Sequence, residues 1–258
     1  MPSLAIRSIG VVLVLAASLS CSPAMAQQPP QEPAPPKPYK KVAVTLPAPV
    51  NDPSFEAFRA QLADIAQRKD RAALAALIVP RGFFWERESG NDADEKKSGI
   101  DNFAAATGLD AADGSGWEFL ADYAAEPTAS QVGDRQDMIC APVAPDFNED
   151  EFIELMTATE TNPIEWGYPT SDGIEARETA KPDSKLVEKL GMHLVRVRFD
   201  DVPPDPAAEP MLHIVTPSGQ LAYIPAEALS PLGIDQLCYV KQDGSWKIMG
   251  YVGEGAPQ

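Results

Sequence analysis

The residue types that most often carry catalysis are sparse in this chain, and none of them stands in a catalytic motif. The only two histidines, His193 and His213, occur in neither an HxH nor an HExxH context, so a zinc site would need further ligands brought by the fold. No serine lies in a G-x-S-x-G elbow, and neither GxGxxG nor GxxxxGK occurs. The sequence therefore predicts no metal, no cofactor and no catalytic residue.

Acidic residues form clusters that could in principle bind a cation or act as an acid–base pair. Residues 146–151 begin like a calcium loop, but Glu151 replaces the glycine of position six and Thr157 replaces the glutamate of position twelve. This segment fits better as a helix start capped by Asn148 and followed by acidic residues in the first turn. The carboxylates near Glu86 leave a hydrolase open as the alternative function.

Three cysteines indicate the redox compartment. Cys21 lies in the N-terminal segment, which leaves Cys140 and Cys238 in the remainder of the chain. In an exported protein these two residues predict one disulfide that closes a long loop. Two buried free thiols, or a nucleophile formed by Cys140 and a histidine, are the alternatives.

The N-terminal segment has the pattern of a secretory signal peptide, residues 1–26. Arg7 precedes a short apolar run, and Ala24-Met25-Ala26 provides a small-x-small cleavage site. A retained membrane anchor is one alternative, and lipoprotein anchoring at Cys21 is another. Ser18 argues against lipidation, because lipoprotein signals usually carry an aliphatic residue three positions before the cysteine. We expect a periplasmic or secreted protein with no membrane span in the mature chain.

Composition supports a folded, acidic protein. The chain has 258 residues, a formal net charge of −17, 44% hydrophobic residues and 26 prolines. Such a length allows one large domain or two small ones, and the apolar fraction excludes disorder of the whole chain. The negative charge argues against nucleic acid as a partner, because phosphates repel an acidic surface.

The local sequence pattern changes along the chain. Residues 27–52 begin with QQPPQEPAPPKP and predict a proline-rich tether, since proline cannot donate backbone hydrogen bonds. Residues 53–161 predict a helical domain. Its expected helices are one over residues 100–109 and four that are capped by Asp52, Asp70, Ser115 and Asn148.

Strand patterns dominate after Pro163. Residues 211–216 and 221–225 flank the polar turn 217–220, and residues 237–242 and 246–252 flank Asp243-Gly244-Ser245. The predicted fold class is therefore α+β, with an N-terminal helical domain followed by a small antiparallel β module.

The second half of the chain resembles bacterial SH3-like domains. The resemblance lies in Gly173-Ile174-Glu175-Ala176-Arg177, in Lys189-Leu190-Gly191, and in residues 216–229, TPSGQLAYIPAEAL. Ala222 stands where the family usually has glycine. The resemblance implies that this module is a small antiparallel SH3-like β barrel, over residues 168–252, that is exported and binds a peptide or a cell-wall component.

The last hairpin, residues 237–252, is also similar to the ending of nuclear-transport-factor-like folds. That similarity implies a small-molecule-binding pocket or a hydrolase as the alternative function. For the SH3-like interpretation, the candidate ligand-binding aromatics are Tyr168, Tyr223, Trp246 and Tyr251. The competing interpretation is that these rings belong to the core, because large rings in alternating strands usually pack inside.

Overall fold

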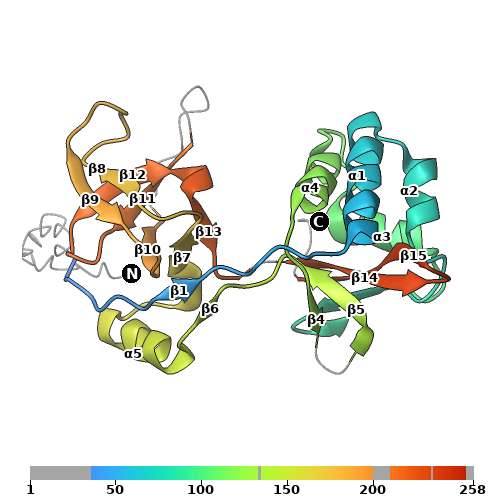
Figure 1. Ribbon diagram of the computed structural model, residues 1–258, viewed down its shortest axis with the longest axis horizontal. Helices are drawn as coiled ribbons and strands as arrows, with labels where there is room; N and C mark the ends of the chain where they lie inside the picture. The colour runs from blue at the N-terminus through green and yellow to red at the C-terminus, as the bar shows by residue number, and fades with distance from the viewer. Residues whose placement is uncertain (1–35, 133–134, 200–209, 234, 254–258) are drawn as a thin grey trace, which may run out of the picture. The chain divides into compact units, whose positions relative to one another are not determined.

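The computed structural model describes residues 36–132, 135–199, 210–233 and 235–253. The predicted signal peptide, Cys21 and the first part of the proline-rich tether lie outside these residues. The described part of the chain contains five α-helices, two 3-10 turns and three β-sheets (Figure 1). The helices are α1 (Pro53–Arg68), α2 (Arg71–Leu77), α3 (Gly99–Thr107), α4 (Ser115–Ala125) and α5 (Glu149–Thr159).

Local capping chemistry sets most helix starts. The Asp52 carboxylate accepts a hydrogen bond from the backbone N–H of Ser54 at 2.8 Å, and Pro53 occupies the first turn of α1. Asp70 caps α2 and Asn148 caps α5 in the same way. These three predicted caps are confirmed. The helix predicted to start at Ser115 is also confirmed, although Gly114 is its N-cap and provides no side-chain hydrogen bond.

A six-stranded sheet gathers strands from both ends of the described chain. Its order is β3-β2-β15-β14-β5-β4. Strand β15 pairs in parallel with β2 and antiparallel with β14, and β14 pairs with β5. The strands are β2 (Phe84–Arg87), β3 (Gly90–Asn91), β4 (Ser130–Val132), β5 (Arg135–Ala141), β14 (Gln236–Gln242) and β15 (Ser245–Val252).

The predicted fold class is wrong. Strands β2 to β6 interrupt the part of the chain that was expected to be helical, and the final hairpin pairs with them instead of completing a small barrel. The hairpin itself was predicted correctly, because its turn is a local feature. Its partners β2 and β5 are about 100 residues or more away in sequence, and no local pattern specifies a pairing at that distance.

Helix α1 buries its apolar stripe in a core formed with helix α4 and this sheet. Phe55, Phe58, Leu62 and Ile65 are all at most 6% exposed. The Phe55 ring meets the Tyr239 ring of β14 edge to face, with centroids 5.1 Å apart. Burial of a large apolar side chain contributes about 1.5–3 kcal/mol to the free energy of unfolding, so this stripe is a main stabilising contact of the helix.

A seven-stranded sheet lies between β6 and β14 in the sequence. Its order is β13-β7-β10-β11-β12-β8-β9, with every neighbouring pair antiparallel. Its own core consists of apolar residues such as Ala176, Val195, Ile214 and Ile224. The strands are β7 (Trp166–Pro169), β8 (Ile174–Arg177), β9 (Leu186–Leu190), β10 (Val195–Arg198), β11 (Met211–Val215), β12 (Leu221–Pro225) and β13 (Leu229–Pro231).

The described end of the proline-rich segment packs on this second sheet. The backbone N–H of Tyr39 donates to the Pro217 carbonyl at 3.0 Å, and the Tyr39 hydroxyl donates to the Val215 carbonyl at 2.8 Å. Gly219 has a positive φ of 80°, and its missing side chain lets Pro38 lie directly against it. Farther along, β1 (Val44–Thr45) pairs with β6 (Asp146–Phe147).

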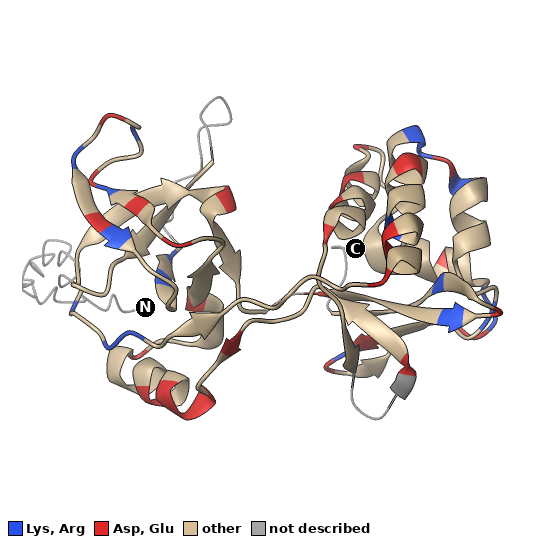
Figure 2. Cartoon of the chain, viewed as in Figure 1, with Lys and Arg blue, Asp and Glu red and all other residues tan. Residues whose placement is uncertain are grey.

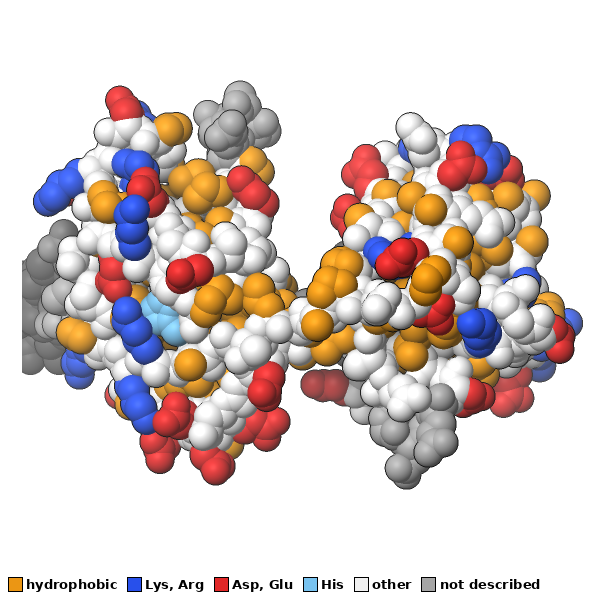
Figure 3. Space-filling model, in the orientation of Figure 1, with side chains coloured by type: hydrophobic (Ala, Val, Ile, Leu, Met, Phe, Trp, Pro, Cys, Tyr) orange, Lys and Arg blue, Asp and Glu red, His pale blue; other side chains and the backbone are white. Residues whose placement is uncertain are grey.

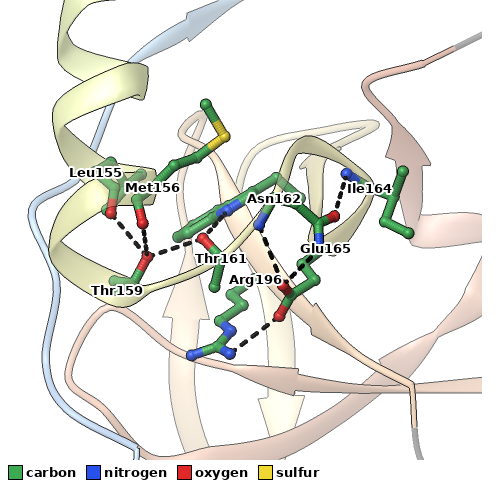
Figure 4. A network of polar contacts seen from close by, with 9 residues as sticks. Leu155, Met156, Thr159, Thr161, Asn162, Ile164, Glu165 and Arg196 are labelled. Carbon is green, nitrogen blue, oxygen red and sulfur yellow. Dashed lines mark hydrogen bonds and ion pairs between the residues drawn. The ribbon is translucent and has the colours of Figure 1, made fainter.

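Polar contacts fix the connection between α5 and β7 (Figure 4). Asn162 and Glu165 form a capping box around the 3-10 turn Pro163–Glu165. Glu165 also binds Arg196 of β10, with the carboxylate and guanidinium 3.0 Å apart. The indole of buried Trp166 donates to the Thr161 hydroxyl at 2.8 Å. These contacts hold β7 in place beside β10.

The predicted disulfide between Cys140 and Cys238 is confirmed. The two residues lie opposite each other on β5 and β14, so the bond joins neighbouring strands of one sheet and does not tie a helical domain to a barrel as expected. A disulfide is consistent with an oxidising compartment. Among the described residues, no helix is both long enough and apolar enough to cross a bilayer.

Candidate functional site

The four aromatic residues proposed for ligand binding divide between the two large sheets. Tyr168 of β7 and Tyr223 of β12 belong to the seven-stranded sheet, whereas Trp246 and Tyr251 belong to β15 of the six-stranded sheet. Tyr168 and Tyr251 are buried, at 8% and 1% exposed. Only Tyr223 and Trp246 are partly accessible, and they line different cavities.

Trp246 has a structural partner for its polar atom. Its indole N–H donates to the Ser54 hydroxyl at 3.0 Å, and its ring meets Phe55 with centroids 5.1 Å apart. Lys241 lies over the ring at 5.3 Å and also donates to the Ser54 hydroxyl at 2.9 Å. These contacts attach the last hairpin to the start of α1.

Tyr168 and Tyr251 are held inside their sheets. The Tyr251 hydroxyl donates to the Asp235 carboxylate, which lies just before β14. Burial raises the pKa of the Tyr168 phenol above its ordinary value. Both rings are therefore buried in the structure described here. A binding role for Tyr168 and Tyr251 stays a prediction.

A cavity of about 470 Å³ opens at Tyr223. Strand β8, the β8–β9 connection, β11, β12 and the 3-10 turn Ala226–Ala228 all contribute to its wall. Apolar side chains predominate, and the polar groups are few. The lining residues are Ile174, Glu175, Arg177, Ala180, Lys181, Pro182, Met211, Tyr223, Pro225 and Ala228.

Strand alternation explains why these side chains point away from the core. In β12 Ala222 and Ile224 are fully buried, which turns Tyr223 to the opposite face. In β8 Ala176 is fully buried, which turns Glu175 and Arg177 outward. The cavity therefore lies on the outer face of the sheet, where the β8–β9 connection forms one of its walls. In Figure 3, hydrophobic side chains lie between basic and acidic ones over the region of β8 and β12.

Hydrogen bonds hold Arg177, one of the two basic residues that line this cavity. The Arg177 guanidinium donates through Nη1 to the Ser184 carbonyl at 2.6 Å and through Nη2 to the Glu175 carboxylate. Glu175 also binds Lys189, with Nζ and Oε1 3.4 Å apart. Because Nη1 and Nη2 each carry two hydrogens, Arg177 keeps N–H groups that can meet a ligand.

Four side chains form a row across the outer face of the sheet. The strand registers place Arg177 of β8 opposite Tyr223 of β12, Tyr223 opposite His213 of β11, and His213 opposite Arg198 of β10. The His213 and Tyr223 rings are stacked, with centroids 4.6 Å apart and planes within 3° of parallel. Each of the four residues is partly exposed.

Sequence reasoning identified Tyr223 but missed the rest of this row. The alternation of Val195 and Val197 with Arg196 and Arg198 was visible and correctly predicted a strand. The pairing of that strand with β11 depends on register, which alternation in one strand does not reveal. The row is therefore defined by the strand registers of the folded protein and not by the pattern of any single strand.

The charge balance of the β8–β9 hairpin differs from that of the chain as a whole. Figure 2 shows both signs of charge on this hairpin, whereas α5 carries acidic residues and no lysine or arginine. Between residues 174 and 190 there are four basic and four acidic residues, within a chain of net charge −17. They are Arg177, Lys181, Lys185 and Lys189 against Glu175, Glu178, Asp183 and Glu188.

Four residues considered for a metal site, a nucleophile or a hydrolase are His193, His213, Cys140 and Glu86. The described residues contain no group of three or more His, Cys, Asp or Glu side chains that could hold a metal ion. Buried His193 has its Nδ1 atom 2.5 Å from the Gly191 carbonyl, and burial lowers the pKa of its imidazole. Glu86 of β2 is exposed, and Cys140 is bonded to Cys238.

Comparisons of the chain with protein-family models, with curated proteins and with solved structures found no match.

Proposed function

We propose that this protein is an exported envelope protein whose seven-stranded sheet is a non-catalytic binding module for an extended peptide. The module corresponds to the segment whose sequence resembles SH3-like domains. The observation that carries the proposal is the cavity at Tyr223, where apolar walls and a few polar groups converge. Its volume of about 470 Å³ falls within the range of about 300–1,000 Å³ that is typical of ligand sites.

The chemistry of the cavity favours a peptide with small or medium apolar side chains. Tyr223 offers a large ring with little conformational freedom, and Met211 is a side chain that adapts its shape to the ligand. Glu175, Arg177 and Lys181 add polar groups on one side, which can fix the orientation of a peptide backbone. The disulfide supports export, because such bonds persist in oxidising compartments.

A titration of the ¹⁵N-labelled full chain tests the proposal. The probe is the blocked peptide Ac-Ala-Pro-Leu-Pro-Gln-NH₂, which is neutral, extended and apolar. We expect the amide signals of Arg177, Tyr223 and Ala228 to shift, while those around Trp246 stay in place. Tyr223→Ala should weaken binding by about five-fold or more, because a buried aromatic contact contributes about 1 kcal/mol.

Trp246→Phe is the matched control, since it alters a partly exposed ring on the other large sheet and should leave the affinity unchanged. Shifts that cluster around Trp246, or an unchanged affinity of Tyr223→Ala, would contradict the assignment of this cavity. If the peptide causes no shifts while isolated cell wall retains the protein, the ligand is the polymer and the peptide assignment is wrong.

A further inference from the structure

We infer that Ser184 is a positioning residue for the peptide site, and that it acts by holding the β8–β9 connection in place as a wall of the cavity. This role rests on the proposed function, because it concerns the same cavity. Ala180, Lys181 and Pro182 of the connection line the cavity, whereas Ser184 does not. An effect of Ser184 on peptide binding therefore has to act through the wall.

The side chains of the β8–β9 connection are too exposed for apolar burial to hold it in one conformation. The connection comprises residues 178–185 and projects beyond the ends of β8 and β9 (Figure 1). Seven of these eight residues are exposed, and Ser184 is the one that is partly buried. Because a surface loop of this kind gains little from burial, its order depends on its hydrogen bonds.

Ser184 is the residue on which the hydrogen bonds of the connection converge. Its hydroxyl donates to the Thr179 carbonyl at 3.0 Å and accepts from the Thr179 N–H at 3.3 Å. Its backbone N–H donates to the Lys181 carbonyl at 3.0 Å. Its carbonyl accepts from Nη1 of Arg177 at 2.6 Å, which attaches the connection to β8. The Ser184 hydroxyl thus joins the two ends of the segment that carries the three lining residues.

A wall that is formed before the peptide arrives makes binding stronger. If only a fraction of the free protein has the connection in its binding conformation, the apparent affinity falls by that fraction. Ser184→Ala removes both bonds of the hydroxyl and keeps the two bonds that the backbone of this residue makes. The segment that lines the cavity then samples more conformations, and ordering it on binding lowers the affinity.

Two substitutions of Ser184 in the full chain test this role, with Ac-Ala-Pro-Leu-Pro-Gln-NH₂ as the probe. Ser184→Ala should weaken peptide binding by about three-fold or more, because both hydroxyl bonds are lost. Ser184→Thr keeps a hydroxyl and should bind within about two-fold of the unmodified protein. The Thr179 amide should exchange with solvent faster in Ser184→Ala than in Ser184→Thr, because only the alanine variant lacks its acceptor. Urea unfolding should give the same free energy for all three proteins.

Ser218→Ala is the matched control, because the Ser218 hydroxyl also forms hydrogen bonds in a turn of the same sheet but does not line the cavity. Its affinity should equal that of the unmodified protein. Unchanged affinity of Ser184→Ala overturns the positioning role and leaves the peptide site standing. A loss that Ser184→Thr does not restore, or that accompanies a lower free energy of unfolding, overturns it as well. If the peptide shifts no signals of the unmodified protein, the proposed function falls together with this role.

Discussion

Cys140 and Cys238 lie directly opposite each other on adjacent strands, with Cα atoms 4.0 Å apart and 97 residues of chain between them. Both side chains are fully buried. The bond closes a loop that contains α5 and the entire seven-stranded sheet. This disulfide within one sheet therefore lowers the conformational entropy that nearly two fifths of the chain would have in the unfolded state.

The first prediction concerns this disulfide. Cys140→Ala/Cys238→Ala should lower the free energy of unfolding by about 3–5 kcal/mol, because the unfolded chain regains the entropy of a long loop. Urea unfolding, monitored by tryptophan fluorescence, measures the change. Reducing agent should destabilise the unmodified protein by a similar amount and leave the double variant unaffected. Equal stability of the oxidised and reduced proteins would contradict the prediction.

The second prediction concerns the contact between Gly219 and the proline-rich segment. A Cβ atom at Gly219 would lie 2.6 Å from the nitrogen of Pro38 and 2.9 Å from the carbonyl carbon of Lys37, so the segment has to move. Gly219→Ala should therefore lower the free energy of unfolding by about 2–4 kcal/mol, from backbone strain and overpacking together. Chemical denaturation of the full chain provides the measurement.

Gly173→Ala is the control for backbone strain. Gly173 has a φ of 79°, almost the same as that of Gly219, but open space surrounds its Cβ position. This variant should lose only about 1 kcal/mol. If both variants lose the same amount, the Pro38 contact contributes nothing to stability.

The third prediction concerns pH. Burial lowers the pKa of His193 below its ordinary value of about 6.5, so the unfolded chain binds a proton more readily than the folded protein does. The free energy of unfolding should fall as pH drops below about 6.5. Lys41, Glu188 and Asp172 are the charged groups near the imidazole. Urea unfolding at about pH 7.5, 6.5 and 5.5 follows the change.

Substitution separates this effect from the titration of carboxylates. His193→Gln should flatten the stability profile between about pH 6.5 and 5.5. His193 is suited to this test, because it is only 3% exposed. A slope that persists in His193→Gln would assign the pH dependence to other groups.

Features with local causes were predictable from the sequence. Asp52, Asp70 and Asn148 start helices because each places an oxygen beside the free N–H groups of the next turn. The polar turns at residues 217–220 and 243–245 were predictable for a similar reason, since turn chemistry acts within four residues. Secondary structure of this kind needs no knowledge of tertiary partners.

Features that depend on distant partners were not predictable. Phe84 of β2 pairs with Gly250 of β15 across 166 positions. Because of this pairing, the segment that was predicted to be a helical domain contributes strands to a mixed sheet. For the binding site, Tyr223 was identified as an aromatic in a strand, but its neighbours Arg177 and His213 follow from register. A shift of one residue in β11 or β12 would have turned His213 or Tyr223, respectively, to the opposite face.

The order of strands in the six-stranded sheet has a consequence for synthesis. Strand β15 joins β2 and β3 on one side to β14, β5 and β4 on the other. Until this strand leaves the ribosome, Phe55 of α1 lacks its ring contact with Trp246. The seven-stranded sheet emerges complete before then, so α1 is made before that sheet but completes its native contacts after it.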